Sequence, residues 1–107
     1  MNRLAGAALC LALSGPGLGA TGNDLYDWCT AGDRAVCNSF LIGTAGTVTT
    51  LQSWKRVKKA YVCLPPEVTA GQLRALVVAE LEANTEQRHL NASSLTLNAL
   101  LKGFPCE

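Results

Sequence analysis

The chain has 107 residues, with nine basic and eight acidic side chains and a formal net charge of +1. This length allows a single domain. A nearly neutral chain does not favour nucleic acid as a partner, because binding to phosphates depends on a strongly basic face.

The first twenty residues have the pattern of a secretory signal peptide. Arg3 gives a positive start, residues 4–13 form an uncharged apolar run, and a stretch with glycines and a proline leads to the small residue Ala20. The run is too short to span a hydrocarbon core, which needs roughly 20 residues. We therefore predict a cut near Ala20, export, and no membrane attachment of the mature chain 21–107. The alternative is an N-terminal helix that remains in the fold.

Four cysteines remain after the predicted cut, and an even number in a small exported chain is typical of a disulfide framework. They are Cys29, Cys37, Cys63 and Cys106. Zinc ligands usually come in close pairs such as C-x-x-C, and no two of these cysteines are that close. The sequence therefore predicts two disulfides and no metal site.

The first predicted helix covers residues 23–29. It is expected to begin with the capping residue Asn23 and to end before Gly32. Leu25, Trp28 and Cys29 would then share one face.

The second predicted helix starts near Arg34 and continues to about residue 59. Two glycines three residues apart, Gly43 and Gly46, are expected to mark the close approach of another backbone. The side chains expected to point inward are Cys37, Leu41, Val48 and Leu51.

The third predicted helix has the clearest start in the chain. Thr69 and Gln72 have the spacing of a capping box, and Val68 and Leu73 flank it as a hydrophobic staple does. An apolar stripe follows on one face of the helix, made of Leu73, Leu76, Val77 and Leu81.

A polar break separates this helix from the fourth, which is expected to begin at Asn91 and to stop before Pro105. Its apolar residues recur at helical spacing: Leu97, Leu100, Leu101 and Phe104. Four helices with short links predict an all-α protein, a small four-helix bundle stabilised by two disulfides.

Three pairings of four cysteines are possible. In an antiparallel bundle the end of the fourth helix lies near the start of the third, which favours a bridge from Cys63 to Cys106. A turn between the first two helices would bring Cys29 to Cys37.

The sequence offers little for catalysis. His89 is the one histidine, and the four mature cysteines already have a structural use. Motifs for zinc hydrolases, serine hydrolases, phosphate loops and dinucleotide binding are not found. We predict a protein that is not an enzyme and needs no cofactor.

One local charge excess stands out, in the stretch "WKRVKKAY" at 54–61. Four cations at the end of a helix would interact favourably with its dipole. The alternative is a docking surface for an acidic partner, with Trp54 and Arg56 as anchors.

Four stretches, in this order, resemble the Rap/Tai family of immunity proteins. "NDLYDWC" resembles the family's opening helix, and "CNSFLIG" at 37–43 resembles C-x-G-Y-I-x-G. "VCLPPEVTAGQL" at 62–73 resembles C-L-P-x-G-V-T-x-x-Q-L, and 88–106 resembles the closing helix with its A-L-x-x-x-F-P-C ending. The chain departs from the family at Ser39–Phe40, where a Gly-Tyr pair is usual, and at Asn84–Thr85, where His-Pro is usual.

The resemblance implies a periplasmic, commonly dimeric helical protein that inhibits a peptidoglycan amidase effector of type VI secretion. Such proteins occlude the active-site cleft of the effector. The loop at 83–90 is the expected probe, with Glu86, Arg88 and His89 as candidate contact residues and Trp54 and Arg56 as a second surface. Two alternatives are a periplasmic interaction or chaperone-like module without a toxin partner, and a small hydrolase that uses His89.

Overall fold

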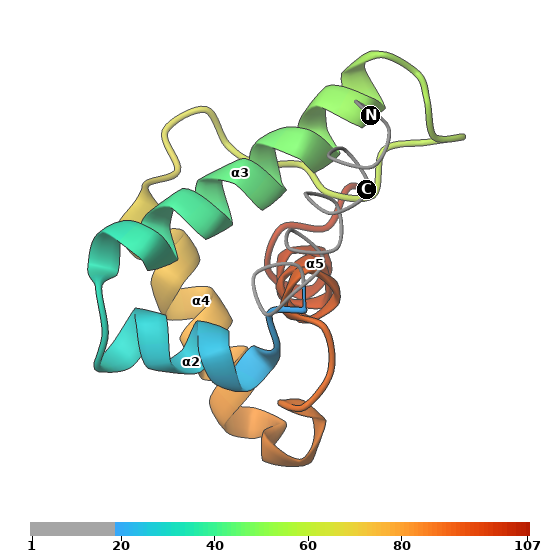
Figure 1. Cartoon of the computed structure of the whole chain (residues 1–107). Helices are drawn as coiled ribbons and strands as arrows, with labels where there is room; N and C mark the ends of the chain where they lie inside the picture. The colour runs from blue at the N-terminus through green and yellow to red at the C-terminus, as the bar shows by residue number, and fades with distance from the viewer. Residues whose placement is uncertain (1–18) are drawn as a thin grey trace, which may run out of the picture.

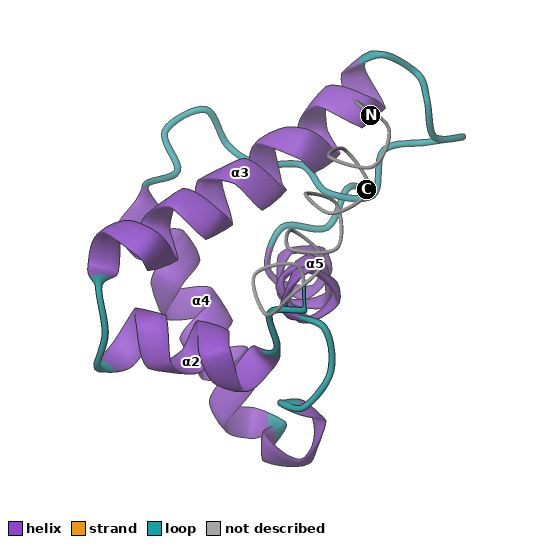
Figure 2. Cartoon of the chain, in the orientation of Figure 1, coloured by secondary structure: helices purple, strands orange, loops and turns teal. Residues whose placement is uncertain are grey.

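The computed structural model describes residues 19–107. This part of the chain folds into four α-helices and a short 3₁₀ helix, and it contains no β-strand beyond two isolated bridges (Figure 2). The elements are α2 (Gly22–Thr30), α3 (Arg34–Ser53), α4 (Ala70–Ala83), η1 (Thr85–Gln87) and α5 (Ala92–Gly103). The predicted all-α class is confirmed.

Each α-helix contacts the other three, so they enclose one core (Figure 1). In Figure 1, α3 lies above α2, and α5 is seen almost end-on beside them. The largest fully buried apolar side chains are Leu25, Leu41, Leu81, Leu100, Val62 and Val77. They come from all four helices and from the segment before α4, so no helix has a separate core.

Helix α2 begins two residues earlier than predicted. Its N-cap is Thr21, not Asn23, and a capping box joins Thr21 to Asp24. The Thr21 backbone N–H donates to Asp24 Oδ2 at 2.9 Å, and the Thr21 hydroxyl accepts from the Asp24 N–H at 3.3 Å. An Asp completes this box in place of the usual Glu or Gln.

Helix α3 ends at Ser53, so its predicted continuation to residue 59 is wrong. Beyond the cap, Lys55 has a left-handed backbone with φ 60°. Its N–H donates to the Gln52 carbonyl at 3.1 Å, and the Arg56 N–H donates to the Leu51 carbonyl at 2.9 Å. These two bonds form a Schellman motif, which ends the helix without a glycine.

The inward face of α3 is shorter than predicted. Cys37 and Leu41 are buried, Val48 is half-buried and Leu51 is exposed. Ala45 is the last buried residue of the helix, so its C-terminal part packs less closely against the body than its N-terminal part.

The expectation that Gly43 and Gly46 mark a close backbone approach is also wrong. No atom of residues 19–107 outside the helix's own neighbouring backbone lies within 4 Å of a Cβ added at either position. Both glycines are exposed. They therefore leave the helix without the stabilisation that a side chain would provide.

We expect Gly46→Ala to raise the free energy of unfolding by about 1 kcal/mol, because alanine is the better helix former and the site is open. Urea denaturation followed by circular dichroism measures the change. A destabilised variant would show that the glycine is required by packing after all.

Helices α4 and α5 start where predicted. The Thr69–Gln72 capping box is present at α4, and the Asn91 side chain accepts from the backbone N–H groups of Ser93 and Ser94 at α5. Of the predicted apolar residues, Leu73, Val77, Leu81 and Leu100 are buried, and Leu76, Leu97, Leu101 and Phe104 are partly buried against the core. Four further buried residues of α5 were not predicted: Ala92, Leu95, Thr96 and Ala99.

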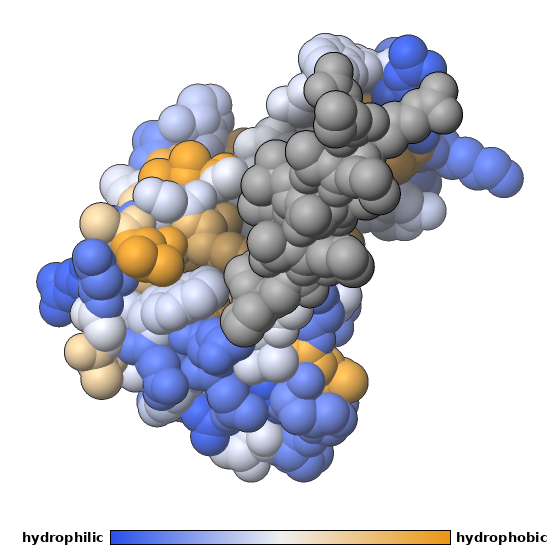
Figure 3. All heavy atoms as spheres, in the orientation of Figure 1, coloured by the Kyte–Doolittle hydropathy of each residue, from blue (hydrophilic) through white to orange (hydrophobic). Residues whose placement is uncertain are grey.

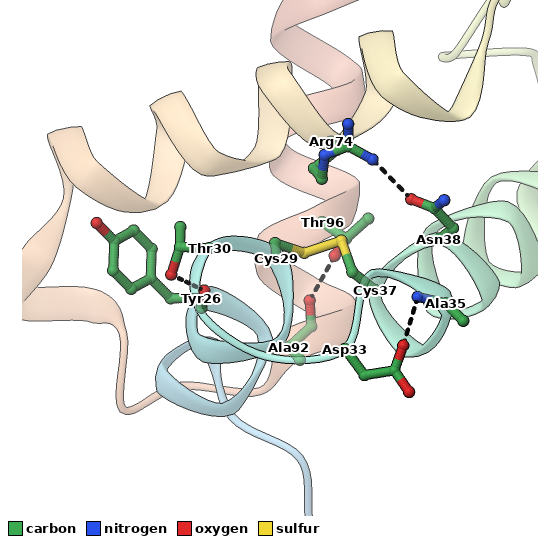
Figure 4. The surroundings of a disulfide bond; sticks show 10 residues. All are labelled: Tyr26, Cys29, Thr30, Asp33, Ala35, Cys37, Asn38, Arg74, Ala92 and Thr96. Carbon is green, nitrogen blue, oxygen red and sulfur yellow. Dashed lines mark hydrogen bonds between the residues drawn. A yellow bond between two sulfur atoms is a disulfide. The ribbon is translucent and has the colours of Figure 1, made fainter.

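Both predicted disulfides are confirmed. Cys29–Cys37 is buried between α2 and α3, as Figure 4 shows, with an Arg74 to Asn38 hydrogen bond of 3.0 Å nearby. Cys63–Cys106 lies nearer the surface. Two backbone hydrogen bonds flank it: the Cys63 N–H donates to the Phe104 carbonyl at 2.8 Å, and the Cys106 N–H donates to the Tyr61 carbonyl at 3.2 Å.

The predicted signal peptide, 1–20, lies outside the described residues except for its last two positions. Ala20 is buried, and its carbonyl accepts from the Ala92 N–H at 2.9 Å. Among residues 19–107, none of the helices combines the length and apolar character that a membrane crossing requires.

Candidate docking surfaces

The loop between α4 and α5, residues 84–91, carries three of the predicted contact residues. It contains η1, and its second half is bound to the start of α2. The Asn23 N–H donates to the Arg88 carbonyl at 2.8 Å, and the Gly22 N–H donates to the Leu90 carbonyl at 2.9 Å. An isolated bridge pairs Thr21 with Asn91. The second half of the 84–91 loop is thus held against the start of α2.

Side chains add to this attachment. The Arg88 guanidinium stacks over the Tyr26 ring, with its central carbon 4.3 Å from the ring centroid. The Tyr26 hydroxyl donates to Glu82 Oε2 at 2.8 Å. That hydrogen bond raises the pKa of Tyr26 above its ordinary value, with burial as the second cause. The neutral phenol is therefore favoured, and it joins α2, α4 and the loop.

The three predicted residues of the 84–91 loop differ in what they can contact. Glu86 and His89 are exposed. Arg88 is partly buried, and its Nε atom is enclosed without a hydrogen-bond partner among the described residues. The geometry therefore gives Arg88 a part in anchoring the loop and leaves Glu86 and His89 available to a partner.

Sequence reasoning missed the residue that makes this attachment possible. A Cβ added at Gly22 would lie 2.9 Å from the Arg88 carbonyl oxygen and 2.4 Å from Leu95 Cδ1. Because only a glycine allows the loop backbone so near α2, Gly22 marks a close approach of two backbone segments. Its place at the start of a helix gave no signal of this in the sequence.

The second predicted surface lies elsewhere. Trp54, with 68% of its surface exposed, follows the end of α3, and Arg56 lies in the loop beyond it. Figure 1 places this segment at the upper right and the 84–91 loop at the bottom. The five predicted contact residues therefore form two separate surfaces.

An apolar groove lies beside the second surface, between the end of α3, residues 57–62 and α5. We call it the α3–α5 groove; its volume is about 380 Å³. It is lined by Val48, Leu51, Gln52, Val57, Tyr61, Val62, Leu97 and Leu101. It continues along α3 into a shallower groove, since Val48 and Leu97 line both.

Among residues 19–107 there is no group of three or more His, Cys, Asp and Glu side chains that could hold a metal ion. His89 lies on the exposed loop. Cys29, Cys37, Cys63 and Cys106 are all in disulfides.

Comparison with known families decides the identity of the chain. A model of the Rap1a immunity proteins matches residues 21–106. The chain belongs to this family. No curated protein and no solved structure matches it. The predicted resemblance to the Rap/Tai immunity proteins is thereby confirmed, and the matched range includes both disulfides and all four helices.

Two residues at which this Rap1a family member departs from the expected pattern make contacts within the fold. Phe40, where a tyrosine is usual, packs against Trp28 with ring centroids 5.9 Å apart. Asn84, where a histidine is usual, donates from its side chain to the Glu80 carbonyl and carboxylate, each at 2.9 Å. Both residues stabilise the scaffold, and Asn84 fixes the point where the 84–91 loop leaves α4.

Proposed function

We propose that this protein is a periplasmic immunity protein that binds a peptidoglycan amidase effector of type VI secretion and blocks its active-site cleft. Membership of the Rap1a family implies a type VI secretion immunity protein with a cognate effector. The periplasm is the compartment where peptidoglycan is attacked, and it permits disulfides. The predicted signal peptide supports export to it.

The observation that carries the proposal is the fixed 84–91 loop. A loop that enters a cleft loses conformational entropy unless it is ordered beforehand. Here two backbone hydrogen bonds to α2, the Arg88–Tyr26 stack and the Asn84 bonds to Glu80 order it in the unbound chain. Glu86 and His89 then face a partner from a rigid support, which is what an inhibitor requires.

Co-expression in the periplasm with candidate amidases, scored as rescue from lysis, tests this proposal. We expect the wild-type chain to rescue cells. The Glu86→Ala/His89→Ala variant should bind the amidase with an affinity reduced at least about 10-fold, because it has lost interface anchors. Glu67→Ala is the matched control, because Glu67 is also an exposed loop carboxylate away from the 84–91 loop. Rescue by no candidate, or equal affinity of both variants, would count against the proposal.

A second candidate function is a periplasmic interaction or chaperone-like module without a toxin partner. The exposed apolar residues favour it, because several gather on α3 and beyond its end, including Ile42, Leu51, Trp54 and Val57. This function predicts that the protein prevents aggregation of unfolded periplasmic chains and that no amidase is recovered with it.

Sedimentation of the mature chain would test the homodimer that the family resemblance implies.

A further inference from the structure

The α3–α5 groove has an almost wholly apolar lining. The amide side chain in its lining, that of Gln52, is hydrogen-bonded to the segment that forms the groove wall. Gln52 Nε2 donates to the Val62 carbonyl at 2.8 Å, and Gln52 Oε1 accepts from the N–H groups of Tyr61 and Val62 at 2.8 and 3.1 Å. The surface left to a ligand is that of Val48, Leu51, Val57, Tyr61, Leu97 and Leu101.

The rim of this groove is basic. Residues 55–59, the basic segment, hold Lys55, Arg56, Lys58 and Lys59, all exposed. The sequence has no Asp or Glu from Arg34 to Pro66, and the one ion pair among residues 19–107 joins Lys102 to Glu80. In Figure 3, hydrophilic residues gather at the upper right, where Figure 1 places this segment. Among residues 19–107 no carboxylate forms an ion pair with the four cations of the basic segment, and Glu107 is the acidic residue that lines a neighbouring pocket with Lys59.

We propose that the α3–α5 groove binds an acidic amphipathic segment of a partner protein. Apolar side chains of the segment would fill the groove, and its carboxylates would meet the basic segment. A helix that lays its apolar face into a groove is a common mode of recognition. The complementary charge would increase the rate and the specificity of binding.

The charges favour this occupant over a second copy of the chain. A two-fold contact through this face would bring the basic segment of one copy near that of the other, because such interfaces use the same patch twice. Like charges placed together oppose association. A concave groove also fits a polypeptide segment better than the flat surface of a membrane. The inference goes beyond the proposed function and does not depend on an amidase partner.

Fluorescence anisotropy of the mature, disulfide-bonded chain tests the groove. The probe is a labelled peptide of about 18 residues, long enough to populate a helix in water, with leucines on one face and glutamates on the other. We expect saturable binding that weakens as salt rises from about 0.05 to about 0.5 M, because ions screen exposed charges. The same peptide with lysines in place of glutamates should bind at least about 10-fold more weakly.

The Val57→Lys variant distinguishes binding in the apolar groove from attraction by charge alone. It adds a cation but places it in the apolar groove, so we expect the affinity for the acidic peptide to fall about 10-fold. Val36→Lys is the matched control, since Val36 and Val57 are 42% and 39% exposed and Val36 lies near the start of α3. This control should keep or slightly raise the affinity. Tyr61→Lys provides a second groove variant should Val57→Lys fail to fold.

Several results would overturn the inference. Unchanged or tighter binding by Val57→Lys would show that charge alone attracts the peptide. Absence of saturable binding would exclude an acidic segment as the occupant. Self-association that strengthens with salt and is lost in Val57→Lys would assign the groove to a second copy. Binding to phosphatidylglycerol vesicles in preference to the peptide would assign it to a membrane surface.

Discussion

Replacing Cys63 and Cys106 together by alanine will lower the free energy of unfolding by about 4 kcal/mol, the chain-entropy value for a loop of this length. The two cysteines are 43 positions apart, and their bridge closes off α4, the 84–91 loop and α5 in one covalent loop. Without it the unfolded chain gains far more freedom than the folded chain. Small domains have total stabilities of about 5–15 kcal/mol, so this variant will be marginally stable.

Urea denaturation of the double variant, followed by circular dichroism, measures this loss. Intact mass spectrometry serves as the control, because it must show that the Cys29–Cys37 bridge is still formed. That bridge spans only eight positions, for which the same model gives about 2.5 kcal/mol. A loss below about 1 kcal/mol on removal of Cys63–Cys106 would contradict a mainly entropic role.

The pairing of the cysteines could be predicted because it follows from chain topology. Once four helices with short links are recognised, Cys63 and Cys106 fall at the same end of the bundle. The start of α4 was predictable for a different reason: the Thr69–Gln72 capping box is a local pattern, and its hydrogen bonds join residues within one helical turn.

The end of α3 could not be predicted, because no local residue stops the helix. Its sequence continues with good helix formers beyond Ser53 and has no glycine or proline there. The helix ends in the Schellman motif at Lys55 and Arg56, and the Gln52 side chain holds the returning segment through the backbone of Tyr61 and Val62. Lys55 then takes the left-handed conformation that lets the chain reverse.

Some features of the candidate docking surfaces could be predicted from the sequence and others could not. The exposed positions of Glu86 and His89 could be expected from a polar loop between two helices. The role of Arg88 in anchoring the loop could not be predicted, because it depends on Tyr26, which is 62 positions earlier in the chain. The α3–α5 groove likewise requires residues from α3, α5 and the loop between α3 and α4, so no single stretch of sequence reveals it.

Gly22→Ala will destabilise the protein by about 1–3 kcal/mol, the usual range for an added methyl group in a packed site. A Cβ at Gly22 would lie 2.9 Å from the Arg88 carbonyl oxygen and 3.0 Å from the Arg88 Cα atom. Backbone atoms cannot rotate away as the end of a side chain can. The 84–91 loop must therefore move outward, and the Gly22–Leu90 and Asn23–Arg88 hydrogen bonds will lengthen or break.

Two measurements separate this local effect from a general loss of helix stability. Urea denaturation gives the free energy of unfolding, and hydrogen exchange reports whether the amides of Gly22 and Asn23 lose protection. The matched control is Gly71→Ala, because Gly71 also lies in the first turn of a helix that begins with a threonine N-cap and a capping box. There the nearest atoms lie 3.8 Å away, so alanine should be neutral or stabilising. Equal stability of the two variants would mean that the loop does not depend on a glycine at the start of α2, and the rigid support assigned to Glu86 and His89 would lose its structural basis.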